Sequence, residues 1–258
     1  RRLSRRGLDR VAGVGSVHGE SETAMSERRI MRLTPELVAR IPPGGGGEPF
    51  TVAPEGMRLA GEPELASIAR SLLESAPDPS AIWVFAYGSL IWKPAFEHSE
   101  HRIALVRGWR RRFCLGWDRM FRGSDDRPGL MLALDRGGQC RGVAYRIPPG
   151  MELEALTSLA RREMRLLPHP FPPRWLRVQT DFGQVMALAF VIDRNSGRYV
   201  GDLDVEATAK ILATAAGPAG SMAEYLHATV RHLQQHGIHD HALWALQDRV
   251  ARLIEQEV

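Results

Sequence analysis

The middle of the chain carries short apolar segments, several of which alternate apolar and polar residues as half-buried β-strands do. Strands are predicted on this pattern for residues 82–86, 102–107, 111–117, 130–134, 140–147, 174–180 and 184–192. Turn-forming residues separate several of these segments, among them Gly108, Pro128-Gly129 and Gly137-Gly138. The pattern therefore predicts a sheet of short strands joined by tight turns.

Helical periodicity lies on both sides of this strand-rich block and once within it. Helices are predicted for residues 31–41, from Pro63 to about Leu72, and for 151–164, 204–215, 220–236 and 239–256. A block of strands with one inserted helix, followed by a helical last third, is not a regular βαβ repeat. The order favours an α+β fold with a curved or barrel-like sheet.

The first 50 residues differ in composition from the rest. Residues 1–24 are rich in Arg, Gly and Ser without apolar periodicity, and residues 42–49 have the composition of a linker. We therefore expect a disordered tail and linker over residues 1–50 and one domain over 51–258. Met25 and Met31 are alternative start sites, and a transit peptide is a competing interpretation of the Arg-rich segment.

Composition and charge exclude several classes of function. Hydrophobic residues make up 44% of the chain, but no apolar stretch approaches the ~20 residues that cross a bilayer, so no membrane role is expected. The net charge is +4, and five arginines fall within the first ten residues, so a nearly neutral domain gives no support to a nucleic-acid partner. Neither nucleotide-binding glycine motif is present.

Two cysteines, Cys114 and Cys140, are too few for a disulfide framework or a structural zinc site. Their apolar surroundings favour small buried side chains over a catalytic thiol. A reducing cytoplasm is the expected compartment. His232 and His236 have metal-ligand spacing, but a solvated helix end is the favoured interpretation, and no metal is predicted.

The segment Val84-Phe85-Ala86-Tyr87-Gly88-Ser89-Leu90-Ile91-Trp92 is the strongest candidate for a binding site. An apolar strand ends abruptly in Tyr-Gly-Ser, where backbone N–H groups need a partner other than a neighbouring strand. The glycine lets the chain turn sharply and approach a ligand closely. Successive N–H groups in such a turn can hold an anion. Ser89 lacks the G-x-S-x-G elbow of a nucleophile.

Glu163 is the carboxylate whose position is most unusual. On a helix it shares a face with the apolar residues Leu156, Leu159 and Ala160. Burial and the negative end of the helix dipole would both raise its pKa and suit it to acid–base chemistry. The alternative is an ordinary surface ion pair with Arg162, Arg165 or Arg174.

Tyr225 follows a Gly- and Pro-rich loop at the start of a predicted helix, for which Ser221 is a plausible N-cap. From the first turn of that helix its hydroxyl can point into a pocket. An aromatic side chain half-buried against the core is an equally good interpretation from the sequence alone.

Residues 84–92 resemble the FGYGSLIW strand and loop of the ChaC-like γ-glutamylcyclotransferases, the glutathione-specific branch. Further similar segments follow in the family's order: Arg111-Arg112-Phe113, residues 128–134, residues 142–146, Arg162-Glu163-Met164, and residues 215–218 to Glu224-Tyr225-Leu226. Each motif is weak alone, but six in order over about residues 82–250 are specific.

The resemblance implies a small mixed β-barrel of about six to seven strands surrounded by helices. It implies cleavage of glutathione to 5-oxoproline and Cys-Gly without metal or organic cofactor. It makes Glu163 the acid–base residue, and it assigns substrate binding to Val84, Phe85, Ala86, Tyr87, Gly88, Ser89, Leu90 and Tyr225. The Glu163 carboxylate must then lie within the length of a glutamyl unit of the 86–90 loop. A monomer or weak dimer without macromolecular partners is expected.

The sequence departs from the family pattern in three places. Ala86 stands where Gly is usual, residues 165–173 replace a Gly-x-Tyr stretch, and Met222 replaces an expected Asn. These changes question substrate choice more than fold. Two alternatives stay open: the same reaction on other γ-glutamyl peptides or amines, and a non-catalytic γ-glutamyl-binding regulatory protein.

Overall fold

The computed structural model describes residues 30–44, 53–201 and 203–256. Its centre is a closed barrel with the strand order β2-β4-β3-β6-β7. The barrel strands are β2 (Trp83–Ala86), β3 (Glu100–Asp118), β4 (Gly129–Arg146), β6 (Pro173–Thr180) and β7 (Gly183–Phe190). Strands β2 and β7 pair in parallel and close the barrel, whereas the other pairs are antiparallel. The predicted mixed barrel within an α+β fold is thus confirmed.

The expected number of six to seven barrel strands is wrong, because β3 and β4 each unite two predicted strands. The supposed turn at Gly108 lies within β3 at a bulge between Arg107 and Trp109, opposite Gly137-Gly138 of β4. All three glycines have positive φ, between 69° and 96°. Glycines in this conformation bend a strand without ending it. Both strands therefore continue past the glycines, and the barrel has five strands.

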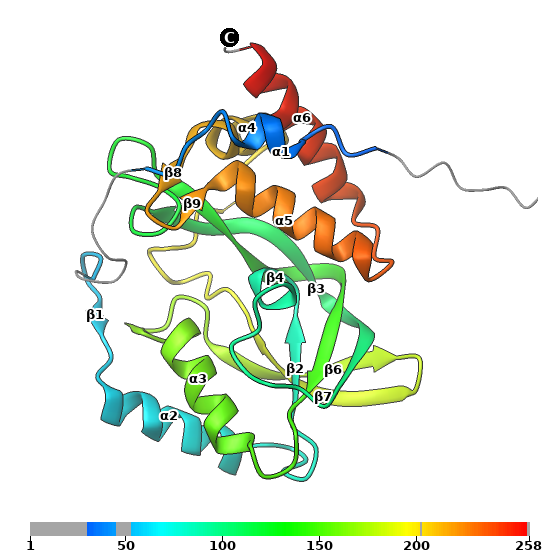
Figure 1. The fold of residues 1–258 in the computed structure, drawn as a ribbon. Coiled ribbons are helices and arrows are strands. Elements are labelled where there is room, and N and C mark those ends of the chain that lie inside the picture. The colour runs from blue at the N-terminus through cyan, green and yellow to red at the C-terminus, as the bar shows by residue number, and fades with distance from the viewer. Residues whose placement is uncertain (1–29, 45–52, 202, 257–258) are drawn as a thin grey trace, which may run out of the picture. The chain divides into compact units, whose positions relative to one another are not determined.

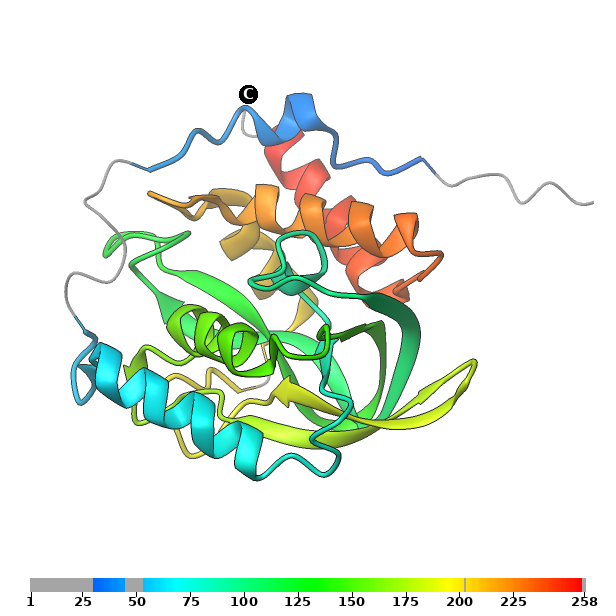
Figure 2. The same cartoon turned by 60° about the horizontal axis from the view of Figure 1, so that its bottom comes forward.

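Six α-helices occur in the described residues. They are α1 (Pro35–Val38), α2 (Glu62–Glu74), α3 (Glu152–Glu163), α4 (Val205–Thr214), α5 (Met222–Gln235) and α6 (His241–Gln256). Helices α4, α5 and α6 gather with α1 on one side of the barrel, whereas α2 and α3 lie side by side at another (Figure 1). The same two groups stay apart after rotation (Figure 2). Within the described ranges, no helix has both the length and the apolar character needed to cross a bilayer.

Part of the predicted tail and linker is packed on the domain. Leu33 is fully buried, and its backbone N–H donates to Gln247 Oε1 of α6 at 2.9 Å. Thr34 is the N-cap of helix α1, and its hydroxyl accepts from the Leu37 N–H. Residues 31–44 therefore belong with the folded residues, and positions 1–29 and 45–50 of the expected tail and linker lie outside the described residues.

Two small sheets flank the barrel. Strand β1 (Arg58–Leu59) pairs with β5 (Leu166–Leu167), and the Ala60 N–H donates to the Arg165 carbonyl at 2.8 Å. Strands β8 (Ala216–Gly217) and β9 (Gly220–Ser221) form a hairpin just before α5. The first sheet supports the segment that follows α3, and the second sets the start of α5, so both hold chain near the candidate site.

Candidate active site

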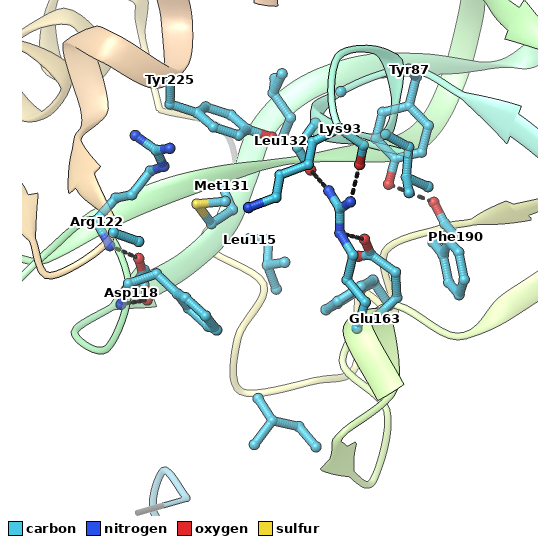
Figure 3. A pocket seen from close by; sticks show the side chains of 18 of the residues that line it. Tyr87, Lys93, Leu115, Asp118, Arg122, Met131, Leu132, Glu163, Phe190 and Tyr225 are labelled. Carbon is cyan, nitrogen blue, oxygen red and sulfur yellow. Dashed lines mark hydrogen bonds and ion pairs between the residues drawn. The ribbon is translucent and has the colours of Figure 1, made fainter. Parts of the chain in front are cut away.

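A cavity of about 440 Å³ opens where the end of β2, the end of α3 and the start of α5 meet. Its wall includes Tyr87, Ser89, Arg162, Glu163 and Tyr225, together with side chains of β3 and β4 (Figure 3). The residues predicted from separate stretches of the sequence are therefore neighbours in space.

The loop after β2 supplies one wall of this cavity. Tyr87, Gly88, Ser89 and Leu90 line it, and residues Ser89–Ile91 form a short 3₁₀ turn, η1. The Tyr87 hydroxyl donates to the Phe190 carbonyl at 2.8 Å, which leaves the tyrosine anchored to β7. The predicted binding residues Val84, Phe85 and Ala86 lie in β2, fully buried, and do not line the cavity.

Strand β4 fixes the path of β2 just before this loop. A Cβ atom at Gly142 would lie 2.3 Å from the Ala86 carbonyl oxygen, so the close pairing requires glycine there. Ala86 itself is fully buried, and its methyl group does not reach the cavity wall. The Ala-for-Gly departure at 86 therefore places no side chain in the cavity.

Arg111 of β3 holds the loop from behind. Only 2% of its side chain is exposed, and its Nε donates to the Tyr87 carbonyl. Its Nη2 donates to the Arg141 carbonyl at 2.6 Å, and Nη1 forms an ion pair with Asp240. One guanidinium thus joins the loop to β4 and to the residue before α6.

Glu163 is the last residue of α3 and lines the cavity with a side chain that is 17% exposed. Its carboxylate accepts from Arg162 Nε at 2.9 Å. The same guanidinium donates through Nη2 to the Ser89 hydroxyl at 2.8 Å, and through Nη1 to the Lys93 carbonyl. One guanidinium therefore contacts both the Glu163 carboxylate and Ser89 of the 86–90 loop. The predicted ion pair with Arg162 exists, but at the cavity wall.

Tyr225 comes from the first turn of α5, where the Ser221 hydroxyl caps the helix by accepting from the Glu224 N–H at 3.1 Å. Its hydroxyl would lie 3.2 Å from a Cβ atom built on Gly88, so loop and tyrosine are in close contact. Trp92 packs edge-on against the ring, and the Arg122 guanidinium lies 5.4 Å from its centroid. The tyrosine is thus both a core side chain and a part of the cavity wall.

Burial shifts the pKa values of three side chains at the cavity, Glu163, Tyr225 and Tyr87. Burial raises the pKa of Glu163, against the opposing effect of the Arg162 charge and hydrogen bond. Burial, assisted by the negative charge of Glu163, raises the pKa of Tyr225 to about 12 and that of Tyr87 well above its usual range. Both phenols are therefore neutral at pH 7, whereas the carboxyl group is shifted toward the range in which it can exchange a proton.

The altered segment after Glu163 also reaches the cavity. Arg165, Leu166 and Phe171 line it, so an apolar ring stands in the wall where the family pattern led us to expect a hydroxyl. Met222 does not line the cavity. Its side chain is fully buried against Gly129, where an added Cβ atom would lie 3.1 Å from the Met222 Sδ. Of the departures, the 165–173 segment bears directly on what the cavity accepts.

Several cavity residues were not found from the sequence, among them Lys93, Asp118, Arg122, Met131 and Leu132. Asp118 is fully buried and accepts from the N–H groups of Met120, Phe121 and Arg122, so it shapes the turn that carries Arg122. An acidic residue just past an apolar strand was the available signal. Nothing in the local pattern places Met131 or Leu132 in a cavity wall.

The paired histidines have other partners. His232 stacks on Trp92 with ring centroids 5.7 Å apart, and His236 lies edge-on to His101. Among the residues that the structure describes, no three His, Cys, Asp or Glu side chains are arranged to hold a metal ion.

Barrel and cavity together define a concave small-molecule site in an α+β barrel, with the carboxylates of Glu163 and Asp118 in its wall. The family described as ChaC-like protein matches residues 82–253. The chain belongs to this family, as its sequence motifs predicted.

Relatives of known activity cover most of the chain. It is 36% identical over 208 residues to the glutathione-specific γ-glutamylcyclotransferase of Escherichia coli (strain K12). The aligned region covers 80% of this chain and 88% of the E. coli protein. It is 35% identical over 182 residues to glutathione-specific γ-glutamylcyclotransferase 1 of Homo sapiens. The aligned region covers 69% of this chain and 82% of the human protein.

The fold is also that of a solved relative. The crystal structure of the yeast γ-glutamylcyclotransferase specific to glutathione superposes with a TM-score of 0.61 at 24% identity. The superposition covers 67% of this chain and 96% of the yeast chain. The two proteins therefore share a fold over this region.

Proposed function

We propose that this protein is a glutathione-specific γ-glutamylcyclotransferase, which releases 5-oxoproline and Cys-Gly and so degrades glutathione. The observation that carries the proposal is the guanidinium of Arg162, which joins the Glu163 carboxylate to Ser89 at the wall of one cavity. The relatives named above support the substrate. A cytoplasmic location and a monomeric or weakly dimeric state stay predictions.

Binding folds the γ-glutamyl group into a ring-like shape. Backbone N–H groups of the 86–90 loop hold the glutamyl unit, and Tyr225 closes the wall beside Gly88. Val84, Phe85 and Ala86 contribute by fixing the strand from which the loop leaves. Ser89 is a positioning residue, because its hydroxyl already accepts from Arg162. Holding amine and carbonyl of one molecule in attack geometry can contribute ~7–11 kcal/mol.

Glu163 moves the protons of the reaction. Its carboxylate accepts a proton from the α-ammonium group, and the freed amine attacks the γ-carbonyl carbon to form the ring C–N bond. Loop N–H groups oppose the charge that develops on the carbonyl oxygen. The original amide C–N bond then breaks as Glu163 returns its proton to the nitrogen of Cys-Gly. The second proton that the attacking nitrogen loses passes through the same carboxylate to that nitrogen, so the ring keeps one N–H and Cys-Gly leaves with an ammonium group. Atoms balance without water, electrons or a cofactor.

Phe171 favours a second candidate, the same reaction on other γ-glutamyl peptides or amines. Its ring lines the cavity within the segment that departs from the family pattern. An apolar wall accepts an apolar leaving group at least as readily as a polar one. Glu163 and the loop would act identically on such a substrate, so the two candidates differ only in the group that is released.

Incubation with glutathione is expected to yield 5-oxoproline and Cys-Gly in equal amounts. Parallel incubation with γ-glutamyl dipeptides compares the two candidates through their kcat/KM values, measured by chromatographic quantitation of 5-oxoproline. A higher kcat/KM with the dipeptides would select the second candidate. Absence of 5-oxoproline from every γ-glutamyl substrate would leave a non-catalytic binder.

The pH dependence of kcat/KM is expected to report Glu163. The reaction needs the carboxylate form, so activity falls as pH decreases through the pKa of this group. Because burial raises that pKa, the acidic limb lies above 4.5, the ordinary value for glutamate. Initial rates at low substrate concentration between pH 4 and 8 measure it. An acidic limb at or below the ordinary value would contradict the assignment of Glu163 as the base.

A further inference from the structure

Lys93 follows η1 and places a positive charge in the cavity. Its backbone carbonyl accepts from Arg162, so its main chain is tied to the group that holds Glu163. Its side chain is exposed and lines the cavity. Figure 3 shows the ammonium group extending away from Glu163 and Tyr87, toward the side of Met131 and Arg122. The charge therefore stands apart from the acid–base end.

Other charged groups of this wall have partners. Arg162 pairs with Glu163, and Arg122 pairs with Glu224 at 2.8 Å. Asp118, the acidic residue on the same side as the lysine, accepts from three backbone N–H groups. Among the described residues, Lys93 forms no ion pair with a carboxylate. This part of the cavity wall thus presents a cation that a substrate anion can meet.

The proposed reaction fixes which part of the substrate lies there. The α-amine must contact Glu163, so the γ-glutamyl end occupies the Glu163 and Ser89 side of the cavity. The leaving Cys-Gly unit extends from the γ-carbonyl over about 7 Å, the reach of two residues, and ends in a carboxylate. That carboxylate points away from Glu163, as the Lys93 side chain does.

We propose that the Lys93 ammonium group binds the terminal carboxylate of the leaving dipeptide, and so makes Lys93 a specificity residue for acidic leaving groups. The proposal rests on the proposed function, whose substrate it defines more closely. It gives the enzyme a means to prefer glutathione despite the apolar Phe171. A γ-glutamyl amine without a carboxylate gains nothing from this contact. The interaction forms equally in substrate and transition state, so it acts on KM and leaves kcat unchanged.

The experiment compares Lys93→Met with the unaltered protein on two substrates, glutathione and its glycine ethyl ester. The variant is expected to raise the KM for glutathione about tenfold, the typical effect of losing a hydrogen bond to a charged group, with kcat within about twofold. The KM for the ester, which lacks the carboxylate charge, is expected not to change. Lys93→Arg should recover most of the affinity, and Lys210→Met, an exposed lysine of α4 outside the cavity, is the matched control.

Equal losses on both substrates, or no loss on either, would overturn the proposal. Calorimetric binding of the same two compounds to Glu163→Gln, with and without Lys93→Met, separates this result from catalysis. If the unaltered protein forms no 5-oxoproline but Lys93→Met still weakens glutathione binding selectively, the proposed function fails and the carboxylate site stands. If affinity is unchanged in that background, the carboxylate site fails whatever the turnover.

Discussion

Replacing Glu163 by glutamine is expected to reduce 5-oxoproline formation by about 10²–10⁴-fold, the usual contribution of a positioned general acid–base. Glutamine has nearly the shape of glutamate but neither accepts nor returns a proton. Its amide oxygen can still accept from Arg162, so the guanidinium keeps its bonds to Ser89 and Lys93. Turnover and calorimetric binding of glutathione, measured together, should show loss of the first and retention of the second.

Folding of this variant has a defined expectation as well. Because burial raises the pKa of Glu163, the charged carboxylate lowers stability as pH rises above 4.5, and the effect is complete above the shifted pKa. Neutral glutamine removes this cost, so the variant should unfold at no lower temperature than the unaltered protein at pH 7. Glu154→Gln makes the same change at an exposed position of α3 and should leave turnover intact. Undiminished turnover by Glu163→Gln would sink the acid–base assignment.

Replacing Arg111 by methionine is expected to have the largest effect on stability, a loss of ~3–5 kcal/mol in the free energy of unfolding. The change removes a buried guanidinium and leaves Asp240 and the carbonyls of Tyr87 and Arg141 without their donor. Asp240 also caps α6 through the Leu243 N–H, so the start of that helix is disturbed too. Denaturant unfolding followed by circular dichroism measures the loss.

Two further variants separate the effect of a methionine on a β3 position from the loss of the hydrogen bonds that the Arg111 guanidinium donates. Arg107→Met makes the same substitution at an exposed position of β3 and should cost less than about 0.5 kcal/mol. Arg111→Lys keeps the charge but cannot reach three acceptors in the geometry of a guanidinium, so its stability should fall between the two. If Arg111→Met were as stable as Arg107→Met, the guanidinium would not be what holds the loop to β4 and α6.

The candidate site consists of residues held by buried secondary structure and by a few side-chain hydrogen bonds. Loop 86–90 leaves a fully buried strand, and Glu163 ends a helix whose other face packs on α2. Arg162 and Arg111 then hold the loop at two points, the Ser89 hydroxyl and the Tyr87 carbonyl. Positioning of this kind matters most for a reaction in which both reacting groups belong to one molecule.

Local pattern was sufficient for the elements that carry the site. An apolar strand broken by Tyr87-Gly88-Ser89 is visible as an interruption, because strands end where their N–H groups lose partners. Glu163 stands out because helical spacing places it among apolar residues. The start of α5 is visible because Ser221 caps it. These signals depend only on residues a few positions apart.

The number of barrel strands could not be obtained in this way. Gly108 and Gly137-Gly138 have the composition of turns, yet they lie opposite one another inside paired strands. A glycine with positive φ suits a turn and a bulge equally. The neighbouring strand decides between them, and pairing is a property of the folded sheet.

By itself, the sequence determined the family and the α+β class, and it predicted the 86–90 loop and Glu163 as site residues, since each is encoded in local order and spacing. Only the tertiary structure placed Arg162 between Glu163 and Ser89, set Arg111 behind the loop, buried Ala86 away from the cavity and turned Lys93 into it. Closing the barrel brings together side chains far apart in the chain, and the resulting burial sets the pKa of Glu163. Neither the neighbours nor their electrostatic effect can be read from residues taken in order.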